Sequence, residues 1–314
     1  MILVTGGMGF IGLHTARSLL DAGESVVLTR FRAWRLPRFL EDELGERLHV
    51  EPIDLADGWA VLDLLRRRSV TGIVHLAAPA PGPSPAPEYR SGLLGLINVL
   101  EAARQHGVRR VSVASSVSVY SNAGPGPWRE GDPLPVESET HTSAEKKALE
   151  ILALHFADRT GLDVRILRLG VIYGPLYHSM ANLPSRLCQA AVRGQPPRLD
   201  DVRVGTPYAL DVADLCYVKD CAAGIRLLHL ADRLRHRVYN LGGGRAVLNQ
   251  ELAEAVRRAV PGAEISLPSR PRHPGAEHAY MDISRIREDT DYTPRYDLAS
   301  GVADYIAWLR EEPR

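Results

Sequence analysis

Three glycines close to the start of the chain have the spacing of a phosphate-binding turn. Gly6, Gly9 and Gly12 lie three residues apart, directly after the short apolar run from Ile2 to Val4. Residues without a Cβ atom let the backbone bend sharply and approach a ligand closely. The helix predicted to follow offers free N–H groups and a partial positive charge, which suit a pyrophosphate. The stretch therefore predicts a dinucleotide site, with an ordinary glycine turn as the alternative.

Two arginines follow the second predicted strand, where a dinucleotide fold holds the adenosine ribose. An acidic residue there accepts a hydrogen bond from the 2′-hydroxyl of NAD, whereas an arginine suits the 2′-phosphate of NADP. The chain has Arg30 and Arg32 after the strand predicted at 25–29, and no acidic residue stands there. The pair favours NADP(H) over NAD(H), because a guanidinium binds phosphate in a bidentate manner. The alternative is two solvated loop arginines.

Hydroxyl and ammonium groups occur where a substrate could meet such a cofactor. Ser115 and Ser116 follow a strand predicted at 111–114. A hydroxyl at a strand end can donate a hydrogen bond to a substrate carbonyl, although a serine-rich turn would look the same. Lys146 and Lys147 are two of the three lysines in the chain, and both lie in a helix predicted over 140–160.

Strands and helices must alternate to position these groups. Apolar runs predict strands at 2–4, 25–29, 48–51, 73–77, 111–114 and 162–169. Apolar residues at helical spacing fill the intervals, which predicts an α/β fold, a Rossmann-type doubly wound parallel sheet. Beyond residue 173 the alternation is less regular. We expect a dinucleotide-binding domain over 1–172, joined by 217–245, and a smaller, partly helical substrate-binding lobe from 173–216 and 246–314.

Composition limits the partners of the protein. The 314 residues have a formal net charge of zero, 45% hydrophobic and 24% charged residues, as in soluble globular proteins. Without a basic excess no nucleic-acid partner is expected, and no apolar run reaches the ~18 residues that span a membrane. Cys188, Cys216 and Cys221 lack metal-ligand spacing, so we expect no metal and a reduced, cytoplasmic location. The first strand starts at the N-terminus, so no signal peptide is expected.

Seven short motifs follow one another along the chain. They are TGGMGFIG at 5–12, DL at 54–55, HLAA at 75–78, SSVSVY at 115–120, RLGVIYGP at 168–175, YVKDCA at 217–222 and YNLG at 239–242. In this order they resemble the extended short-chain dehydrogenase/reductase family, the NAD(P)-dependent group that includes nucleotide-sugar epimerases and dehydratases. The resemblance covers nearly the whole chain. It is much more specific for the family than for the reaction.

The resemblance implies a role for individual residues. The residues that it implies to hold the cofactor, besides Arg30 and Arg32, are Gly6, Gly9, Phe10, Ile11, Gly12, Asp54, Leu55 and Ala77. Ser116 stands at the catalytic Ser/Thr position. Lys146 stands at the catalytic Lys position, where it would also anchor the nicotinamide ribose. In the substrate lobe, Asn182 is similar to a nucleotide-sugar contact, and Arg270 or Arg272 could meet a phosphate.

The chain departs from the family pattern at the proton donor. The family motif is Y-x-x-x-K, and with Lys146 and Glu150 aligned to it, Thr142 stands at the tyrosine position. A threonine hydroxyl can donate a hydrogen bond to a carbonyl but is a poor proton shuttle at neutral pH. His141 is adjacent, but a helix that starts before it would direct its side chain elsewhere.

Other departures bear on the substrate. Gly92 stands at the family's helix Asn position. The dehydratases carry Asp-Glu just after the catalytic Thr, whereas this chain has Val117-Ser118, which argues against sugar 4,6-dehydration. Ala213 stands where epimerases often have an arginine for the substrate diphosphate. The nucleotide-sugar case is therefore weaker than for a typical member.

Three functions are consistent with these residues. The favoured hypothesis is an atypical NADPH-dependent reductase of a ketone, either a natural product such as a polyketide or a nucleotide sugar. Ser116, together with Thr142, would hold the carbonyl, and the proton would come from water or the substrate. The second is an NAD-dependent nucleotide-sugar epimerase or decarboxylase. The third is a cofactor-binding sensor without redox chemistry. Family members are often homodimers through the helices predicted at 89–106 and 140–160, although those apolar residues could instead be core.

Overall fold

A parallel seven-stranded sheet forms the centre of the protein. The computed structural model describes residues 1–31, 34, 36–79, 84–199, 205–270 and 275–311. The strand order is β10-β6-β5-β4-β1-β2-β3. The bounds are β1 Ile2–Thr5, β2 Val26–Arg30, β3 Leu48–Pro52, β4 Gly72–His75, β5 Arg110–Ser116, β6 Val164–Leu169 and β10 Val238–Leu241. The predicted Rossmann-type, doubly wound α/β fold is confirmed. Strand β10, which lies far from β6 in the sequence, pairs with it at the edge of the sheet.

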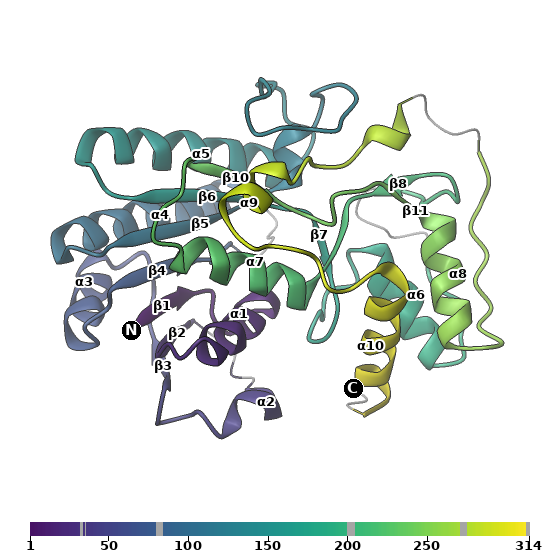
Figure 1. Ribbon diagram of the computed structural model, residues 1–314, viewed down its shortest axis with the longest axis horizontal. Coiled ribbons are helices and arrows are strands. Elements are labelled where there is room, and N and C mark those ends of the chain that lie inside the picture. Colours follow the sequence, from purple (N-terminus) through teal and green to yellow (C-terminus); the bar gives the residue numbers. More distant parts are fainter. Residues whose placement is uncertain (32–33, 35, 80–83, 200–204, 271–274, 312–314) are drawn as a thin grey trace.

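Helices cover both faces of this sheet (Figure 1). On one face lie α1 (Phe10–Asp21) and α7 (Val218–Leu230), and on the other lie α3 (Gly58–Arg67), α4 (Pro85–His106) and α5 (His141–Thr160). Each set packs on its own apolar cluster against the strands. Burial of each large apolar side chain stabilises the fold by about 1.5–3 kcal/mol relative to exposure. The short α2 (Arg38–Glu41) follows β2.

Capping residues explain where the two long helices begin and end. Helix α4 starts at Pro85, four residues before the predicted start, because proline suits the first turn of a helix. It ends at Gly107, whose φ of 79° is left-handed. Thr140 caps α5 in a capping box with Ser143, and Gly161 ends that helix with a φ of 75°.

The C-terminal lobe has a core of its own. Helices α6 (Leu183–Val192), α8 (Asn249–Ala259) and α10 (Leu298–Glu311) pack around a separate apolar cluster, to the right of the sheet in Figure 1. The short elements that join it to the sheet are η1 Val117–Tyr120, β7 Val171–Tyr173, β8 Val212–Ala213, β9 Leu215–Tyr217, β11 Val247–Leu248, η2 Ala276–His278 and α9 Ser284–Asp289. That this lobe binds the substrate stays a prediction.

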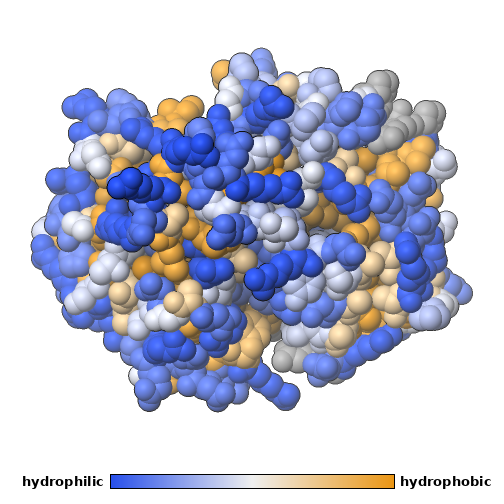
Figure 2. All heavy atoms as spheres, in the orientation of Figure 1, coloured by the Kyte–Doolittle hydropathy of each residue, from blue (hydrophilic) through white to orange (hydrophobic). Residues whose placement is uncertain are grey.

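The face seen in Figure 2 is a mixture of hydrophilic and hydrophobic patches. Within the described part of the chain, no helix combines the length and the apolar character needed to cross a membrane.

Candidate active site

The glycine turn lies between the carboxyl ends of β1, β2 and β4. Strand β1 pairs with β2 on one side and with β4 on the other. Gly6 follows β1 with a φ of 65°, and its N–H donates to Thr29 Oγ1 at 3.0 Å. Gly9 donates to the Gly6 carbonyl at 2.9 Å and then serves as the N-cap of α1. The first N–H groups of α1 are thereby directed to the end of the sheet where open α/β folds bind ligands.

The turn has no room for side chains at two of its glycines. A Cβ atom on Gly6 would lie 2.8 Å from the backbone of Ala77, and one on Gly12 would lie 2.5 Å from the Gly6 carbonyl oxygen. Both obstacles are backbone atoms, which cannot move aside as a flexible side chain can. This close approach is the arrangement that a dinucleotide pyrophosphate requires, so the turn fits a nicotinamide dinucleotide. Phe10 and Ile11 begin α1 and are partly buried against the sheet.

The end of β2 carries one of the two predicted phosphate contacts. The guanidinium carbon of Arg30 lies 5.5 Å from the ring centroid of Trp34. The Nε atom of Arg30 is buried and makes no hydrogen bond within the described part of the chain. A second phosphate contact had been predicted at Arg32, which lies outside the described residues.

The adenine side of the predicted cofactor site is held by backbone contacts. Asp54 is exposed, and its carboxylate accepts the N–H of Ala56 at 2.9 Å. Leu55 packs on the apolar cluster beneath α3 and α4, and Asn98 donates to its carbonyl at 2.8 Å. The two residues therefore form a fixed turn at the end of β3, and whether they contact adenine stays a prediction.

The end of β4 is tied to β1 by a buried histidine. His75 is 2% exposed, and its Nδ1 lies 2.8 Å from Thr5 Oγ1. Burial lowers the pKa of His75 to about 3, and the charge of Lys146 contributes in the same direction. His75 is thus a neutral core residue that holds Ala77 against the glycine turn, and the ammonium of Lys146 is near enough to affect it.

Ser116 and Lys146 lie on neighbouring elements, and Thr142 lies one turn before Lys146. Ser116 ends β5 and caps η1, where its Oγ accepts the N–H of Ser118 at 3.1 Å. Lys146 is 7% exposed and forms no hydrogen bond or close ion pair with another described residue. Burial lowers the pKa of Lys146, while the carboxylates of Glu145 and Glu150 oppose that shift. The catalytic roles predicted for Ser116, Thr142 and Lys146 stay predictions.

A network of hydrogen bonds and an ion pair begins at Ser115, the residue next to Ser116. Glu150 accepts from Ser115 Oγ and pairs with Arg168 at 2.7 Å. Arg168 also donates to the hydroxyl of Tyr120 at 2.8 Å, and that hydroxyl donates to Asn240 Oδ1 at 2.8 Å. Burial raises the pKa of Tyr120 to about 12, although Arg168 and Asn240 act in the opposite direction. These residues join α5, β6, η1 and β10 into one unit.

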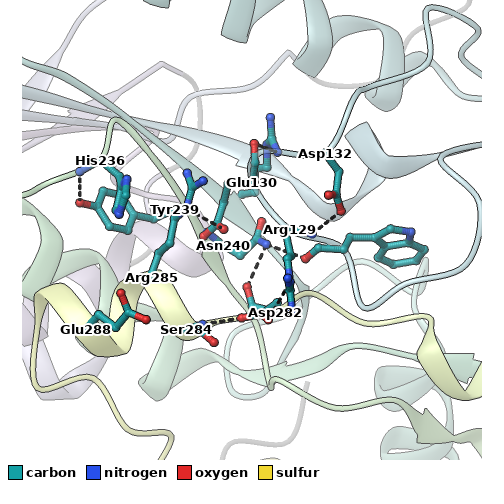
Figure 3. A network of polar contacts seen from close by, with 12 residues as sticks. Arg129, Glu130, Asp132, His236, Tyr239, Asn240, Asp282, Ser284, Arg285 and Glu288 are labelled. Carbon is teal, nitrogen blue, oxygen red and sulfur yellow. Dashed lines mark hydrogen bonds and ion pairs between the residues drawn. The ribbon is translucent and has the colours of Figure 1, made fainter.

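The same network anchors the loop that follows η1 (Figure 3). The backbone N–H of Asn240 donates to the Glu130 carboxylate at 2.8 Å. Its side-chain amide donates to the backbone carbonyls of Trp128 and Asp282. Arg285 of α9 lies 3.4 Å from the Glu130 carboxylate. The loop over 121–140 is therefore fixed on β10 and on the segment before α9, which sets where α5 begins.

A second cluster of charges lies where α4 and α5 begin, and the sequence analysis did not identify it. His141 Nε2 lies 3.0 Å from Glu88 and 3.8 Å from Glu145, and the His141 ring packs on Tyr89 with centroids 4.6 Å apart. Helix α5 begins at His141 itself, so its ring is directed to α4. No local signal could have revealed the cluster, because Glu88 and His141 are far apart in the sequence.

The predicted substrate contacts have structural partners. Asn182 caps α6 through Oδ1, which accepts the N–H of Ser185 at 3.0 Å, and Nδ2 donates to the Ile172 carbonyl. Arg270 pairs with Asp211 at 2.6 Å and lies over Tyr208. The predicted phosphate contact Arg272 lies outside the described residues.

Two hollows outlined by described residues lie elsewhere. A groove of about 790 Å³ lies between α1, α7 and α10, and a smaller one of about 350 Å³ lies beside β9. Neither is lined by the glycine turn, Ser116 or Lys146. We place the candidate active site at the carboxyl edge of the sheet, because the buried ammonium and the glycine turn carry the relevant chemistry and the hollows do not.

Comparison with known proteins gives consistent relatives over nearly the full length. The NAD-dependent epimerase/dehydratase family matches residues 2–242. A dTDP-glucose 4,6-dehydratase of an Actinoplanes species is 30% identical over 98% of this chain and 97% of its own. The UDP-glucose 4-epimerase of Mus musculus is 27% identical over 99% of this chain and 97% of its own.

A solved structure shares both sequence and fold. MoeE5 in complex with UDP-glucuronic acid and NAD is 30% identical, covers 99% of each chain and superposes with a TM-score of 0.78. The cofactor class of this chain is accordingly a nicotinamide dinucleotide. The match of the family over most of the chain agrees with the parallel sheet and the glycine turn that follows its first strand. The chain therefore belongs to the NAD-dependent epimerase/dehydratase family.

Proposed function

We propose that the protein is an NAD(H)-dependent enzyme that oxidises and re-reduces a ring carbon of a nucleotide-linked sugar. The observation that carries this proposal is the full-length similarity to MoeE5, whose structure holds UDP-glucuronic acid and NAD. It differs from the NADPH-dependent ketone reduction that the sequence alone favours. Similarity to enzymes of UDP- and dTDP-sugars over 98–99% of the chain supports the sugar substrate.

The chain's own residues would divide the work as follows. The turn at Gly6 and Gly12 would hold the cofactor diphosphate, and a bound nicotinamide would supply the hydride chemistry. Ser116 would hold the sugar oxygen at the end of β5, and Lys146 would hold the ribose next to the nicotinamide. Because Val117 and Ser118 stand where dehydratases carry Asp-Glu, epimerisation or decarboxylation is favoured over dehydration.

One observation favours a second candidate, the NADPH-dependent reduction of a ketone. No acidic residue ends β2, and the Arg30 Nε is buried without a hydrogen bond inside the described residues. A guanidinium in this place suits the 2′-phosphate of NADP. The same site would then work in one direction only, with exchangeable NADPH.

The first experiment is to identify the nucleotide that the purified protein retains. Protein would be denatured and the released dinucleotide separated by chromatography, and UDP- and dTDP-sugars would then be incubated with the enzyme and followed by NMR. Bound NAD with a changed sugar configuration or a lost carboxyl group supports the proposal. Preference for NADPH that Arg30→Ala abolishes and the exposed Arg66→Ala retains would favour the second candidate. Failure to bind any of NAD⁺, NADH, NADP⁺ and NADPH would overturn both.

The outer faces of α4 and α5 support a homodimer. Leu94, Ile97, Ile151 and Leu152 are 38%, 43%, 69% and 39% exposed. Apolar side chains gathered on two neighbouring helices favour burial against a second copy. Analytical ultracentrifugation of the wild type and of Ile151→Asp tests this, and a monomer in both cases would contradict it.

A further inference from the structure

The charges at the start of α5 differ from those of an ordinary helix terminus. Glu88 and Glu145 are 8% and 4% exposed, so both carboxylates have left water. A buried carboxylate normally receives hydrogen bonds or a well-aligned cation. Here His141 is near both carboxylates, yet neither of its ring nitrogens, which are themselves buried, forms a hydrogen bond with the described residues. The His141 ring therefore packs near the carboxylate of Glu145 without a hydrogen bond to it.

A missing side chain on α4 makes room for one of these carboxylates. A Cβ atom on Gly92 would lie 2.7 Å from Glu145 Oε1 and 3.3 Å from Pro79. Glu145 therefore occupies the space between α4 and the segment that follows β4. That segment leads from Ala77, which packs on the glycine turn, so the carboxylate lies beneath the edge of the sheet where the cofactor would bind.

Helical spacing connects this carboxylate with Thr142. Residues three and four apart are neighbours on a helix surface, whereas adjacent residues are not. Glu145 is three residues after Thr142 and four after His141, so it is the neighbour of both. Lys146, four residues after Thr142, is buried without a direct partner among the residues described. The position that lacks a tyrosine is therefore flanked by a carboxylate and an ammonium.

We propose that Glu145 is the proton-relay residue of this site, acting through the Thr142 hydroxyl, with the His141 ring as its direct neighbour at 3.8 Å. The proposal rests on the proposed function. When a sugar hydroxyl is oxidised, its O–H proton passes to Thr142 Oγ1 as Thr142 gives its own proton to Glu145. The electrons of the broken O–H bond form the C=O bond, and the hydride leaves the carbon for the cofactor. Reduction reverses each transfer.

Other charged groups around the relay are already engaged. On α4, Glu88 and Tyr89 face His141. On α5, Lys147 donates to the Glu137 carbonyl at 2.6 Å, and Glu150 pairs with Arg168. From β4, His75 is neutral and bonded to Thr5. Glu145 is thus the carboxylate near Thr142 that no described arginine or lysine neutralises by direct contact.

The test compares Glu145→Gln with Glu139→Gln, an exposed carboxylate just before α5. Glu145→Gln is expected to lower turnover by about 100-fold or more. It should also remove the limb of the pH–rate profile that the acid–base group produces. Cofactor affinity and the circular dichroism spectrum should stay as in the wild type. Adding Thr142→Tyr to Glu145→Gln is expected to raise turnover again by at least about tenfold, because a tyrosine at this position makes the relay unnecessary. Glu139→Gln should behave as the wild type.

A second measurement needs no substrate. In protein as purified, His141→Asn and Glu145→Gln should shift the melting temperature non-additively by about 2 °C, since the two groups interact directly. Wild-type turnover that Glu145→Gln leaves unchanged, or a loss that Thr142→Tyr does not rescue, would overturn the relay. If the wild type converts none of the sugars, the proposed function fails. Additive melting-temperature shifts would separately overturn the contact between Glu145 and His141 on which the relay is argued.

Discussion

The two ends of the charged stretch on α5 differ in how their carboxylates are paired. One turn after Lys146, Glu150 has a hydroxyl from Ser115 and two guanidinium nitrogens of Arg168 as donors. One residue before Lys146, Glu145 is equally buried, but among the described residues the basic group beside its carboxylate is the His141 ring, at 3.8 Å. The same residue type on the same helix thus lies in a satisfied network at one position and in an unsatisfied one at the other.

This difference is consistent with a structural role for Glu150 and with the chemical role proposed for Glu145. A fully paired network fixes geometry, because each of its members loses hydrogen bonds when any of them moves. Burial opposes the charge of Arg168, but the hydrogen bonds and charge of Glu150 outweigh it and raise the pKa of the guanidinium. The guanidinium of Arg168 therefore stays charged throughout the neutral range. The carboxylate of Glu145 lacks these hydrogen bonds, as the proposed relay requires.

The largest effect is expected from replacing each of the two glutamates by glutamine in a separate variant. Glu150→Gln should lower the free energy of unfolding by about 3 kcal/mol, because it leaves Arg168 buried without its counter-ion. Glu145→Gln should change that free energy by less than about 1 kcal/mol, because it removes a buried charge that has few donors. Urea unfolding of both variants measures the difference, and equal losses would show that the two ends are equally structural.

A matched pair of glycines extends the comparison to the cofactor turn. Gly6→Ala should weaken dinucleotide binding by about 100-fold, or about 2.7 kcal/mol, since its Cβ would lie 2.8 Å from the Ala77 backbone. Gly23 also has a left-handed φ, of 87°, but no atom lies within 4 Å of its Cβ position. Gly23→Ala therefore carries the conformational strain without the clash. Calorimetry with both variants would contradict this view if the two bound equally well.

The stability of the protein in acid tests the buried His229, which lies near arginines, whereas His141 lies near carboxylates. Burial lowers the pKa of His229 to about 3, and Arg110 and Arg109 add to that effect. Between about pH 6.5 and 3 the unfolded chain binds a proton there that the folded protein does not. Stability is therefore lost as pH falls, by about 1.4 kcal/mol per pH unit for this residue.

Unfolding at several pH values checks this slope. His229→Gln should reduce the slope by that amount, whereas His155→Gln, at an exposed position on α5, should not. Burial raises the pKa of Asp214 to about 6, so this carboxyl acts in the opposite direction between about pH 6 and 3.8, equally in both variants. A slope that is the same in both variants would exclude His229 as its source.

The smallest effect is expected at the cap of α5. Thr140→Ala removes the hydroxyl that accepts the N–H of Ser143 at 3.1 Å, at a cost of about 1 kcal/mol. The first turn should loosen around His141 while the Glu150 pair remains closed. Hydrogen exchange would then increase at the first residues of α5 and not at its centre, and a uniform increase along the helix would contradict the division into two ends.

Local patterns in the sequence were sufficient for the parts of the site that the backbone builds. Gly6, Gly9 and Gly12 follow a strand and precede a helix, so their turn is decided within fifteen residues. Alternation of apolar runs predicted six of the seven sheet strands, because each strand and helix carries its own periodicity. The start of α4 at Pro85 was missed, since a proline-rich stretch is typical of both loops and first helical turns.

Side-chain roles that depend on distant partners could not be predicted in the same way. The amide of Asn182 caps α6 and donates to the Ile172 carbonyl, which no sequence pattern indicated, and its contact with a substrate stays a prediction. His141 was expected to point away from the chemistry, and it lies between two carboxylates because α4 and α5 pack side by side (Figure 1).

The sequence by itself determined the dinucleotide turn, the parallel sheet and the absence of a tyrosine at position 142, because each is a property of neighbouring residues. Only the tertiary structure decided that Gly92 leaves space for Glu145 and that Glu88 meets His141. Those contacts join elements about fifty residues apart, so they follow from how α4 packs on α5 and no local pattern encodes them.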